Sequence, residues 1–211
     1  MQVKVIYESD IDAALLGTGL SYNRTSSMSI DDIQANKDSI RDKMLAVVRK
    51  LAPMGNGHNK AIRQTIIAID VDAPFSFHKQ LDTYHIGTVE QSASTMHTLT
   101  KNPFKQDDFE PFYDKRYIDF TINWLNEKRE IYLNTQDKDI KQQCWEDMVN
   151  GLPCGYKQRR IFSCNYETLR CIFRQRIGHK LGHWKTFIDS VYSGVKYPEF
   201  LNDIYLNENK P

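Results

Sequence analysis

The segment Gln64–Pro74, which reads QTIIAIDVDAP, decides the fold class of this chain. Its side chains alternate with a period of two, with Ile67, Ile69 and Val71 on one side and Ala68, Asp70 and Asp72 on the other. This period is typical of a strand with one buried face, and a proline at its end does not continue a strand ladder. The segment therefore predicts a half-buried strand that ends at Pro74.

Upstream of this strand, the sequence predicts one strand, one loop and one helix. Residues 3–7 alternate in the same way and predict a short strand. Residues 17–32 are rich in Gly, Ser, Thr, Asn and Asp, which favours a loop. Apolar residues recur at helical spacing from about Asp38 to Leu51, and Pro53 with the glycines that follow ends this predicted helix.

Downstream of the strand, helices dominate. Phe75–Gln80 is expected to begin a helix, and the small polar residues of Thr83–Thr95 favour a loop. Further helices are expected over Tyr117–Tyr132, over Asp137–Val149, from the cap Asn165 through Leu169, Ile172, Phe173 and Arg176, and over about Leu181–Val191. We therefore expect a single α/β (or α+β) domain over residues 1–211, helix-rich in its second half.

The composition is that of an ordinary globular protein. The 211 residues are 40% hydrophobic and 26% charged, and the net charge of +1 favours neither a nucleic-acid polymer nor a membrane as partner. Within residues 153–188, however, the only acidic side chain is Glu167. The basic side chains there are Lys157, Arg159, Arg160, Arg170, Arg174, Arg176, Lys180 and Lys185. This stretch is either a solvated face or a site for an anionic ligand.

No targeting signal or metal motif stands out. The first residues lack a signal-peptide core, and no stretch approaches the roughly 18 apolar residues of a membrane helix, so we expect a cytoplasmic protein with reduced thiols. The cysteines are Cys144, Cys154, Cys164 and Cys171, without a Cys-x-x-Cys pair. His179 and His183 could share a helical face, but no third ligand lies near them in sequence, so we expect no metal site.

Arg176 is unusual because it shares a helical stripe with Leu169, Ile172 and Phe173, which should face the core. A buried arginine is costly unless an anion or carbonyl groups satisfy it. One interpretation is an ion pair with a buried carboxylate, Asp70 or Asp72. The other interpretation is a ligand site that uses the guanidinium.

Several motifs together resemble the flavin-dependent thymidylate synthases. The matching motifs are Gly57-His58, Ala73-Pro74, Lys79-Gln80, Leu152-Pro153, and Asn165, Leu169 and Arg176 on one helix. They stand at intervals similar to those of the family. The resemblance covers roughly residues 57–95 and 145–190, and in outline most of the chain.

The resemblance implies a fold, a substrate and a cofactor. It implies a homotetramer that uses FAD, a methylene donor derived from folate, and NADPH to convert a pyrimidine deoxynucleotide of the dUMP type. On the flavin side it implies His58, His85 and Asn165. On the nucleotide side it implies Gln80, Glu90, Gln91, Ser92 and Arg176, of which Arg176 is catalytic because its guanidinium would polarise the pyrimidine ring.

The chain departs from the family at its most characteristic motif. The family's Arg-His-Arg is replaced by Thr83-Tyr84-His85, and two arginines of the nucleotide-phosphate clamp fall on Thr95 and Val149. Because each charge-assisted phosphate contact contributes about 1.5–3 kcal/mol, their loss would weaken nucleotide binding strongly. We expect the basic stretch at Arg159 and Arg160 to supply replacement contacts.

Three hypotheses follow from this combination of matches and departures. The chain is a divergent enzyme that transfers a one-carbon group to a pyrimidine deoxynucleotide. Alternatively, it has the family fold without flavin or catalysis, and binds a nucleotide or a partner protein. In the third hypothesis the match is accidental and the chain is an unrelated α/β protein.

Overall fold

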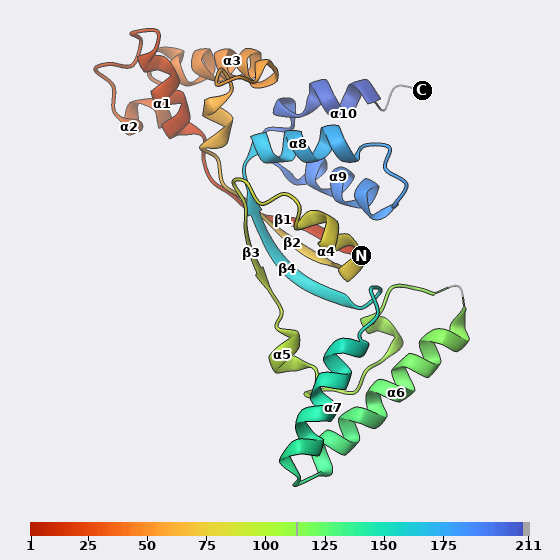
Figure 1. Cartoon of the computed structure of the whole chain (residues 1–211). Helices are drawn as coiled ribbons and strands as arrows, with labels where there is room; N and C mark the ends of the chain where they lie inside the picture. Colours follow the sequence, from red (N-terminus) through yellow and green to blue (C-terminus); the bar gives the residue numbers. More distant parts are fainter. Residues whose placement is uncertain (113, 209–211) are drawn as a thin grey trace. The chain divides into compact units, whose positions relative to one another are not determined.

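The computed structural model describes residues 1–112 and 114–208 and contains both helices and strands, as expected. The strands form one sheet in the order β1 (Gln2–Glu8), β2 (Ile67–Pro74), β4 (Lys157–Cys164) and β3 (Val89–Ser92) (Figure 1). Since β2 and β3 are not neighbours, the chain crosses over between them and β4 is inserted later.

Helices account for most of the remaining described chain. They are α1 (Asp12–Leu20), α2 (Ile30–Gln34), α3 (Ile40–Leu51), α4 (Phe75–Leu81), α5 (Thr95–Thr98), α6 (Lys115–Asn134), α7 (Lys138–Gly151), α8 (Tyr166–Arg176), α9 (His183–Gly194) and α10 (Asn202–Glu208). Single 3-10 turns occur at Lys37–Ser39, Ala52–Met54, Lys60–Arg63, Gln106–Asp108 and Pro198–Phe200.

Strand β2 is the strand that QTIIAIDVDAP predicted, and its two faces are as expected. Ile67, Ile69 and Val71 are completely buried, whereas Ala68, Asp70 and Asp72 are half-buried. The strand ends at Pro74, and α4 begins at the next residue. The alternation predicted both the strand and its buried face because a side-chain period of two follows directly from the pleat.

The sequence also predicted β1, α3, α6, α7, α8 and α9 to within a few residues, and the helix expected to begin at Phe75 is α4. Two predicted loops were wrong in part. Residues 17–32 include the end of α1 and the start of α2, and Thr83–Thr95 contains β3. In α1 the glycines concealed the helix; Gly19 is needed because a Cβ there would collide with Thr25.

Strand β4 was not predicted at all. Its sequence, KQRRIFSC, begins with charged and amide side chains and shows no clear alternation. Gln158 is nevertheless buried. The cost of burying its amide is offset by the hydrogen bond that its side-chain nitrogen donates to the carbonyl oxygen of Ala93 at 2.7 Å. A strand between two neighbours is specified by its partners as much as by its own pattern, which single-sequence reasoning does not detect.

The described chain separates into two compact units. The first unit comprises Met1–Gln2, Val71–Thr83 and Gln91–Arg160. The second comprises Val3–Asp70, Tyr84–Glu90 and the chain from Ile161 onward. Each unit has buried residues of its own and is described separately below.

The first unit is built on the antiparallel pair α6 and α7, drawn in green and teal in Figure 1. Asp114 and Asp137 cap these helices through hydrogen bonds to backbone N–H groups of the first turn. Gly151 ends α7 where a Cβ would collide with the ring of Trp124. A glycine at this position therefore lets the two helices approach closely.

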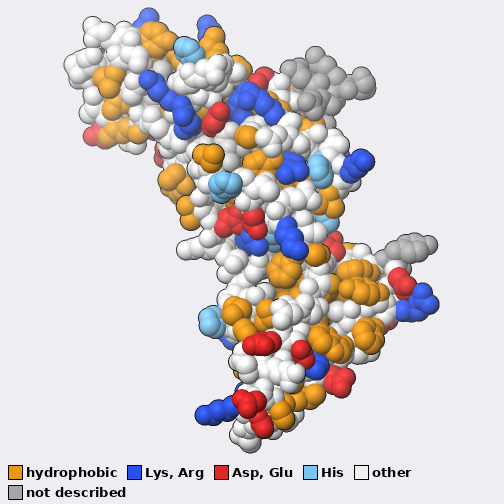
Figure 2. Space-filling view, viewed as in Figure 1, with side chains coloured by type: hydrophobic (Ala, Val, Ile, Leu, Met, Phe, Trp, Pro, Cys, Tyr) orange, Lys and Arg blue, Asp and Glu red, His pale blue; other side chains and the backbone are white. Residues whose placement is uncertain are grey.

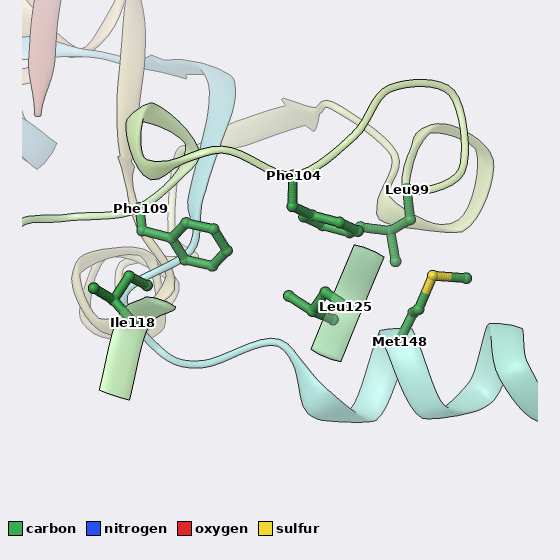
Figure 3. Close-up of a cluster of buried hydrophobic side chains, with 6 residues drawn as sticks. All are labelled: Leu99, Phe104, Phe109, Ile118, Leu125 and Met148. Carbon is green, nitrogen blue, oxygen red and sulfur yellow. The ribbon is translucent and has the colours of Figure 1, made fainter. Parts of the chain in front are cut away.

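An apolar cluster forms the core of this unit. Its buried members are Leu99, Phe104, Phe109, Ile118, Leu125 and Met148 (Figure 3). Leu125 of α6 and Met148 of α7 are completely buried, and the loop residues Leu99 and Phe104 cover them. The helix pair thus buries its facing sides against the 99–109 segment, as amphipathic helices require.

The second unit packs α8 against α9 and α10. Trp184 and Phe187 of α9 and Phe173 of α8 are completely buried. Arg170 of α8 is buried as well, and it donates hydrogen bonds to the carboxylate of Asp203 on α10 and to the carbonyl oxygen of Phe200. A buried guanidinium needs such partners.

The surface carries exposed apolar side chains in both units. Figure 2 shows orange side chains along the part of the surface formed by α6, where Phe120 is 69% exposed. In the second unit, Ile86 is 84% exposed and Val89 is 69% exposed. Among the helices of the described residues, none is both long enough and apolar enough to cross a membrane.

Candidate functional site

Arg176 is the last residue of α8, and aromatic side chains hold it in place. Its Nε donates a hydrogen bond to the hydroxyl of Tyr84 at 2.8 Å. The guanidinium carbon lies 4.7 Å from the ring centroid of Trp184 and 5.5 Å from that of Tyr84. Attraction between a cation and an aromatic ring strengthens when the pair is desolvated, so this arrangement restrains the guanidinium.

Tyr84 is itself fixed. Its side chain is largely buried, and its hydroxyl donates a hydrogen bond to Oε1 of Gln175 at 3.0 Å while accepting the one from Arg176. Burial raises the pKa of Tyr84 above its usual value, and Arg176 opposes part of that rise. Tyr84 is therefore a neutral phenol that accepts from one side chain and donates to the other.

The structure modifies the prediction that Arg176 belongs to the core stripe. Arg176 is half-buried at the helix end, whereas Leu169, Ile172 and Phe173 are completely buried. The completely buried arginine is Arg170, which the sequence analysis did not single out. Its spacing from Tyr166 and Phe173, at four and three residues, was the signal that could have found it.

A hollow of about 370 Å³ lies beside Arg176, at the turn that joins α8 to α9. Its lining includes His179, Lys185 and Ile188 as well as Arg176. The backbone N–H of Leu181 donates to Nδ1 of His179 at 3.0 Å, so Nε2 is the nitrogen that carries hydrogen in the neutral ring. The volume is in the range that accommodates a small ligand.

The segment before β3 lies along the start of α8. Asn165 caps α8, as predicted, by accepting a hydrogen bond from the backbone N–H of Thr168 at 3.0 Å. The hydroxyl of Thr168 donates to the carbonyl oxygen of Ile86 at 3.2 Å. Gly87 has a φ of +72°, and a Cβ there would lie 3.1 Å from the side-chain nitrogen of Asn165.

The two histidines predicted on the flavin side are exposed. His58 lines a hollow of about 170 Å³ together with residues of α1 and α3, and its backbone N–H donates to the carbonyl oxygen of Gly55 at 2.9 Å. His85 is exposed next to the buried Tyr84. The neighbour of His58, Asn59, is buried and hydrogen-bonded to Glu167 of α8.

The predicted site residues divide between the two units. The second unit contains His58, His85, Glu90, Asn165 and Arg176, and the first contains Gln80, Gln91, Ser92, Arg159 and Arg160. Gln80 and Glu90 are half-buried, while Gln91, Ser92 and Arg159 are exposed. The side chains that directly hold Arg176 within its unit, Tyr84 and Trp184, were missed by the sequence analysis.

Arg160 has partners of its own within the first unit. Its Nη1 lies 2.6 Å from the carboxylate of Asp82, and its Nε donates to Oε1 of Gln158 at 2.9 Å. The carboxylate of Asp82 partly neutralises the positive charge of Arg160, which weakens the attraction of Arg160 for a phosphate. The expectation that Arg159 and Arg160 replace the missing phosphate arginines stays a prediction, and of the two Arg159 is the exposed residue.

The sequence analysis also missed a buried histidine in the first unit. His78 of α4 is completely buried, and its Nε2 lies 2.8 Å from the carbonyl oxygen of Gln158. Because a carbonyl only accepts, Nε2 carries the hydrogen, and Nδ1 has no hydrogen-bond partner among the described residues. Burial lowers the pKa of His78 to about 4, so the ring is neutral.

Comparison with known proteins places the fold. No protein-family model and no curated protein matches the chain. A flavin-dependent thymidylate synthase, ThyX from Helicobacter pylori with FAD and dUMP, has a TM-score of 0.70 at 12% identity, over 97% of this chain and 99% of that one. A second structure of that ThyX with FAD and dUMP gives 0.69 at 13% identity, over 97% and 98% of the two chains.

A further similar structure is a UMP/dUMP methylase, PolB from Streptomyces cacaoi, bound with 5-Br dUMP. Its TM-score is 0.58 at 12% identity, over 96% of this chain and 94% of that one. The chain therefore has the fold of the flavin-dependent thymidylate synthases over nearly its whole length. The resemblance that the motifs indicated is confirmed at the level of the fold.

Proposed function

We propose that this chain binds a pyrimidine deoxynucleotide of the dUMP type, with the pyrimidine ring against Arg176. The observation that carries the proposal is the restraint of Arg176 by Tyr84 and Trp184 at the end of α8. The shared fold and the register of Asn165, Leu169 and Arg176 support it. Chemistry supports it too, because a planar guanidinium suits the carbonyl and imide edge of such a ring.

Arg176 would also activate the ring. A guanidinium close to a pyrimidine carbonyl oxygen stabilises negative charge on that oxygen, and a half-buried setting strengthens the effect. Electron density then rises at C5, the carbon that attacks a one-carbon donor. No nucleophile of the protein is required for this step.

The residues present do not fit FAD as the resemblance implies. In the family the Arg-His-Arg motif holds the flavin, yet here the segment Thr83–Thr95 contains neither lysine nor arginine to pair with the FAD diphosphate and includes Glu90. Asn165, expected at the flavin, uses its side-chain oxygen to cap α8, so that oxygen already has a partner within the protein. A flavin would have to bind through other contacts.

Two functions remain, and they share the nucleotide. In the first, the chain is a divergent enzyme that transfers a one-carbon group, by methylation or a related reaction, to the bound deoxynucleotide. FAD, the folate donor, NADPH, a homotetramer and a cytoplasmic location all remain predictions from the resemblance and the sequence. In the second, a flavin-free protein binds the nucleotide or a partner protein, and the lack of cations in Thr83–Thr95 favours it.

Calorimetric titration of the purified protein with dUMP tests the shared proposal. We expect saturable binding that Arg176→Met weakens by tenfold or more, because a charge-assisted hydrogen bond contributes about 1.5–3 kcal/mol. Arg49→Met is the matched control, since Arg49 lies in the same unit and is paired with Glu199 at the surface. Absence of dUMP binding by the wild-type protein would contradict the proposal.

A second measurement separates the two functions. Titration with FAD, followed by flavin fluorescence and absorbance, should show saturable uptake if the chain is the divergent enzyme. Growth of a thymidine-requiring strain on this gene would then support synthase activity. Binding of dUMP without FAD uptake and without such growth would support the flavin-free function instead.

A further inference from the structure

We propose that Tyr84 and Trp184 are positioning residues, which together fix the plane of the Arg176 guanidinium before a ligand arrives. We call Tyr84 and Trp184, with the guanidinium that they hold, the Arg176 clamp. Its geometry follows from the described contacts alone, and its use in nucleotide binding rests on the proposed function. The replacement of the family's Arg-His-Arg by Thr83-Tyr84-His85 thus supplies a holder for Arg176 at the middle position. Tyr84 touches Arg176 and acts through it.

The two contacts of the clamp restrain different motions. The hydroxyl of Tyr84 holds Nε of Arg176 at 2.8 Å, which fixes the side chain about its long axis. The ring of Trp184 lies 4.7 Å from the guanidinium carbon, which restrains motion of the guanidinium across the face of that ring. A lysine ammonium could also donate a hydrogen bond or lie over a ring, but it has no plane to be fixed and no two-nitrogen edge to present to a ligand.

The clamp is rigid because each of its members is fixed by others. Trp184 is completely buried and meets Tyr84 edge to face at 6.1 Å between ring centroids. The hydroxyl of Thr88 donates to the carbonyl oxygen of Tyr84 at 2.7 Å. With Gln175 accepting from the Tyr84 hydroxyl, that hydroxyl has both a donor and an acceptor partner in the second unit.

Preorganisation of this kind raises affinity without adding a contact to the ligand. A free arginine side chain loses conformational entropy when it binds a ligand, because rotation about several bonds stops. A clamped side chain has already lost that entropy in the folded protein. It also presents one orientation, so a planar edge that matches it is selected over one that does not. We expect the clamp to change dUMP affinity by about tenfold.

Selective ¹⁵N labelling of arginine provides a test that needs no ligand. The Nε–H signal of Arg176, assigned by its loss in Arg176→Lys, should exchange slowly with solvent in the wild-type protein. Tyr84→Phe keeps the ring and removes the hydroxyl, and should accelerate that exchange by tenfold or more. Tyr192→Phe, which removes the hydroxyl that donates to Asn202 at 2.8 Å, is the matched control and should leave the signal unchanged.

Unchanged exchange in a folded Tyr84→Phe variant would overturn the inference. If Tyr84→Phe does not fold, as judged by its melting curve, Gln175→Met tests the same clamp from the surface, since Gln175 is exposed and accepts from Tyr84. Faster Arg176 exchange in that variant supports the clamp, and unchanged exchange overturns it.

Titration with dUMP then tests what the clamp does for the ligand. Tyr84→Phe should weaken binding about tenfold, and Tyr192→Phe should leave it unchanged. Equal affinity of wild type and Tyr84→Phe would overturn the role in binding. If wild-type protein does not bind dUMP, the proposed function fails, and the exchange measurement still decides whether Tyr84 positions Arg176.

Discussion

At the scale of single residues, two completely buried polar side chains, Arg170 and His78, differ in the charge that they carry. Arg170 is completely buried and carries its charge, because Asp203 and the carbonyl oxygen of Phe200 accept from it. His78 is equally buried and stays neutral, because burial disfavours the charged ring and lowers its pKa to about 4. The first residue is stable as an ion pair and the second only as a neutral ring.

His78 should therefore make stability depend on pH. Its pKa is lowered from 6.5 to about 4 in the folded protein, so the unfolded chain binds more protons between these values. The stabilisation is fully present above pH 6.5 and is lost as the pH falls towards 4, by up to about 3 kcal/mol. Urea unfolding of the wild-type protein and of His78→Gln at a series of pH values measures this contribution to the free energy of unfolding.

The difference between the two proteins isolates the histidine from the carboxylates, which titrate in both. The stability difference between wild type and His78→Gln should shrink as the pH falls from 6.5 to 4. His97→Gln changes an exposed histidine of the same unit, and its free energy of unfolding should change with pH as that of the wild-type protein does. Parallel curves for wild type and His78→Gln would refute the prediction.

At the scale of elements, the segment Tyr84–Glu90 links the candidate site to α8. It contributes the hydroxyl of Tyr84, which accepts from Arg176, and the carbonyl oxygen of Ile86, which accepts from Thr168. It also contains Gly87, where a Cβ would lie 3.1 Å from the side-chain nitrogen of Asn165. These contacts lie at both ends of α8. A displacement of this short segment should therefore disturb both the helix cap and the clamp.

Gly87→Ala tests that link. The φ of +72° disfavours any residue with a Cβ by roughly 1–2 kcal/mol, and the new Cβ would also press on Asn165 and Thr168 at 3.1 and 3.2 Å. Gly178→Ala is the matched control, with a φ of +73° and nothing within 4 Å of the added atom. Chemical denaturation should show a larger loss of stability for Gly87→Ala than for Gly178→Ala.

Binding provides the second readout for these two variants. Gly87→Ala should weaken dUMP binding, because the displaced segment carries Tyr84, and Gly178→Ala should weaken it less. Similar losses of stability in both variants would show that only the backbone conformation matters. The contact of the 84–90 segment with α8 would then have no special role.

At the scale of the whole molecule, two exposed apolar residues indicate a surface that could bind another copy of the chain. Ile86 is 84% exposed and Val89, on the edge strand β3, is 69% exposed. Apolar side chains on an unpaired strand edge commonly mark a surface that another chain covers. The homotetramer implied by the resemblance would provide such a cover, and it stays a prediction.

Light scattering after size-exclusion chromatography tests the assembly. We expect a mass near four chains for the wild-type protein and a smaller mass for the double variant Ile86→Asp/Val89→Lys. Met54→Lys, which changes another exposed apolar residue of the same unit, should keep the wild-type mass. A wild-type protein that elutes as a monomer would speak against the tetramer.

The elements whose patterns repeat locally could be predicted from the amino-acid sequence. The alternation in Gln64–Pro74, the helical spacing in Ile40–Leu51 and the cap at Asn165 predicted β2, α3 and the start of α8. The motifs also indicated the fold that this chain shares with solved structures to which it is only 12–13% identical.

The surroundings of Arg176, in contrast, depend on how the chain packs. Tyr84 and Trp184 are 92 and 8 residues from it in the chain, and no local pattern connects them. The same holds for β4, which is stabilised by neighbours far away in sequence, and for the pair Arg170–Asp203. Periodicity reports how one element meets the core, whereas a site depends on which distant side chains are brought together, and packing decides that.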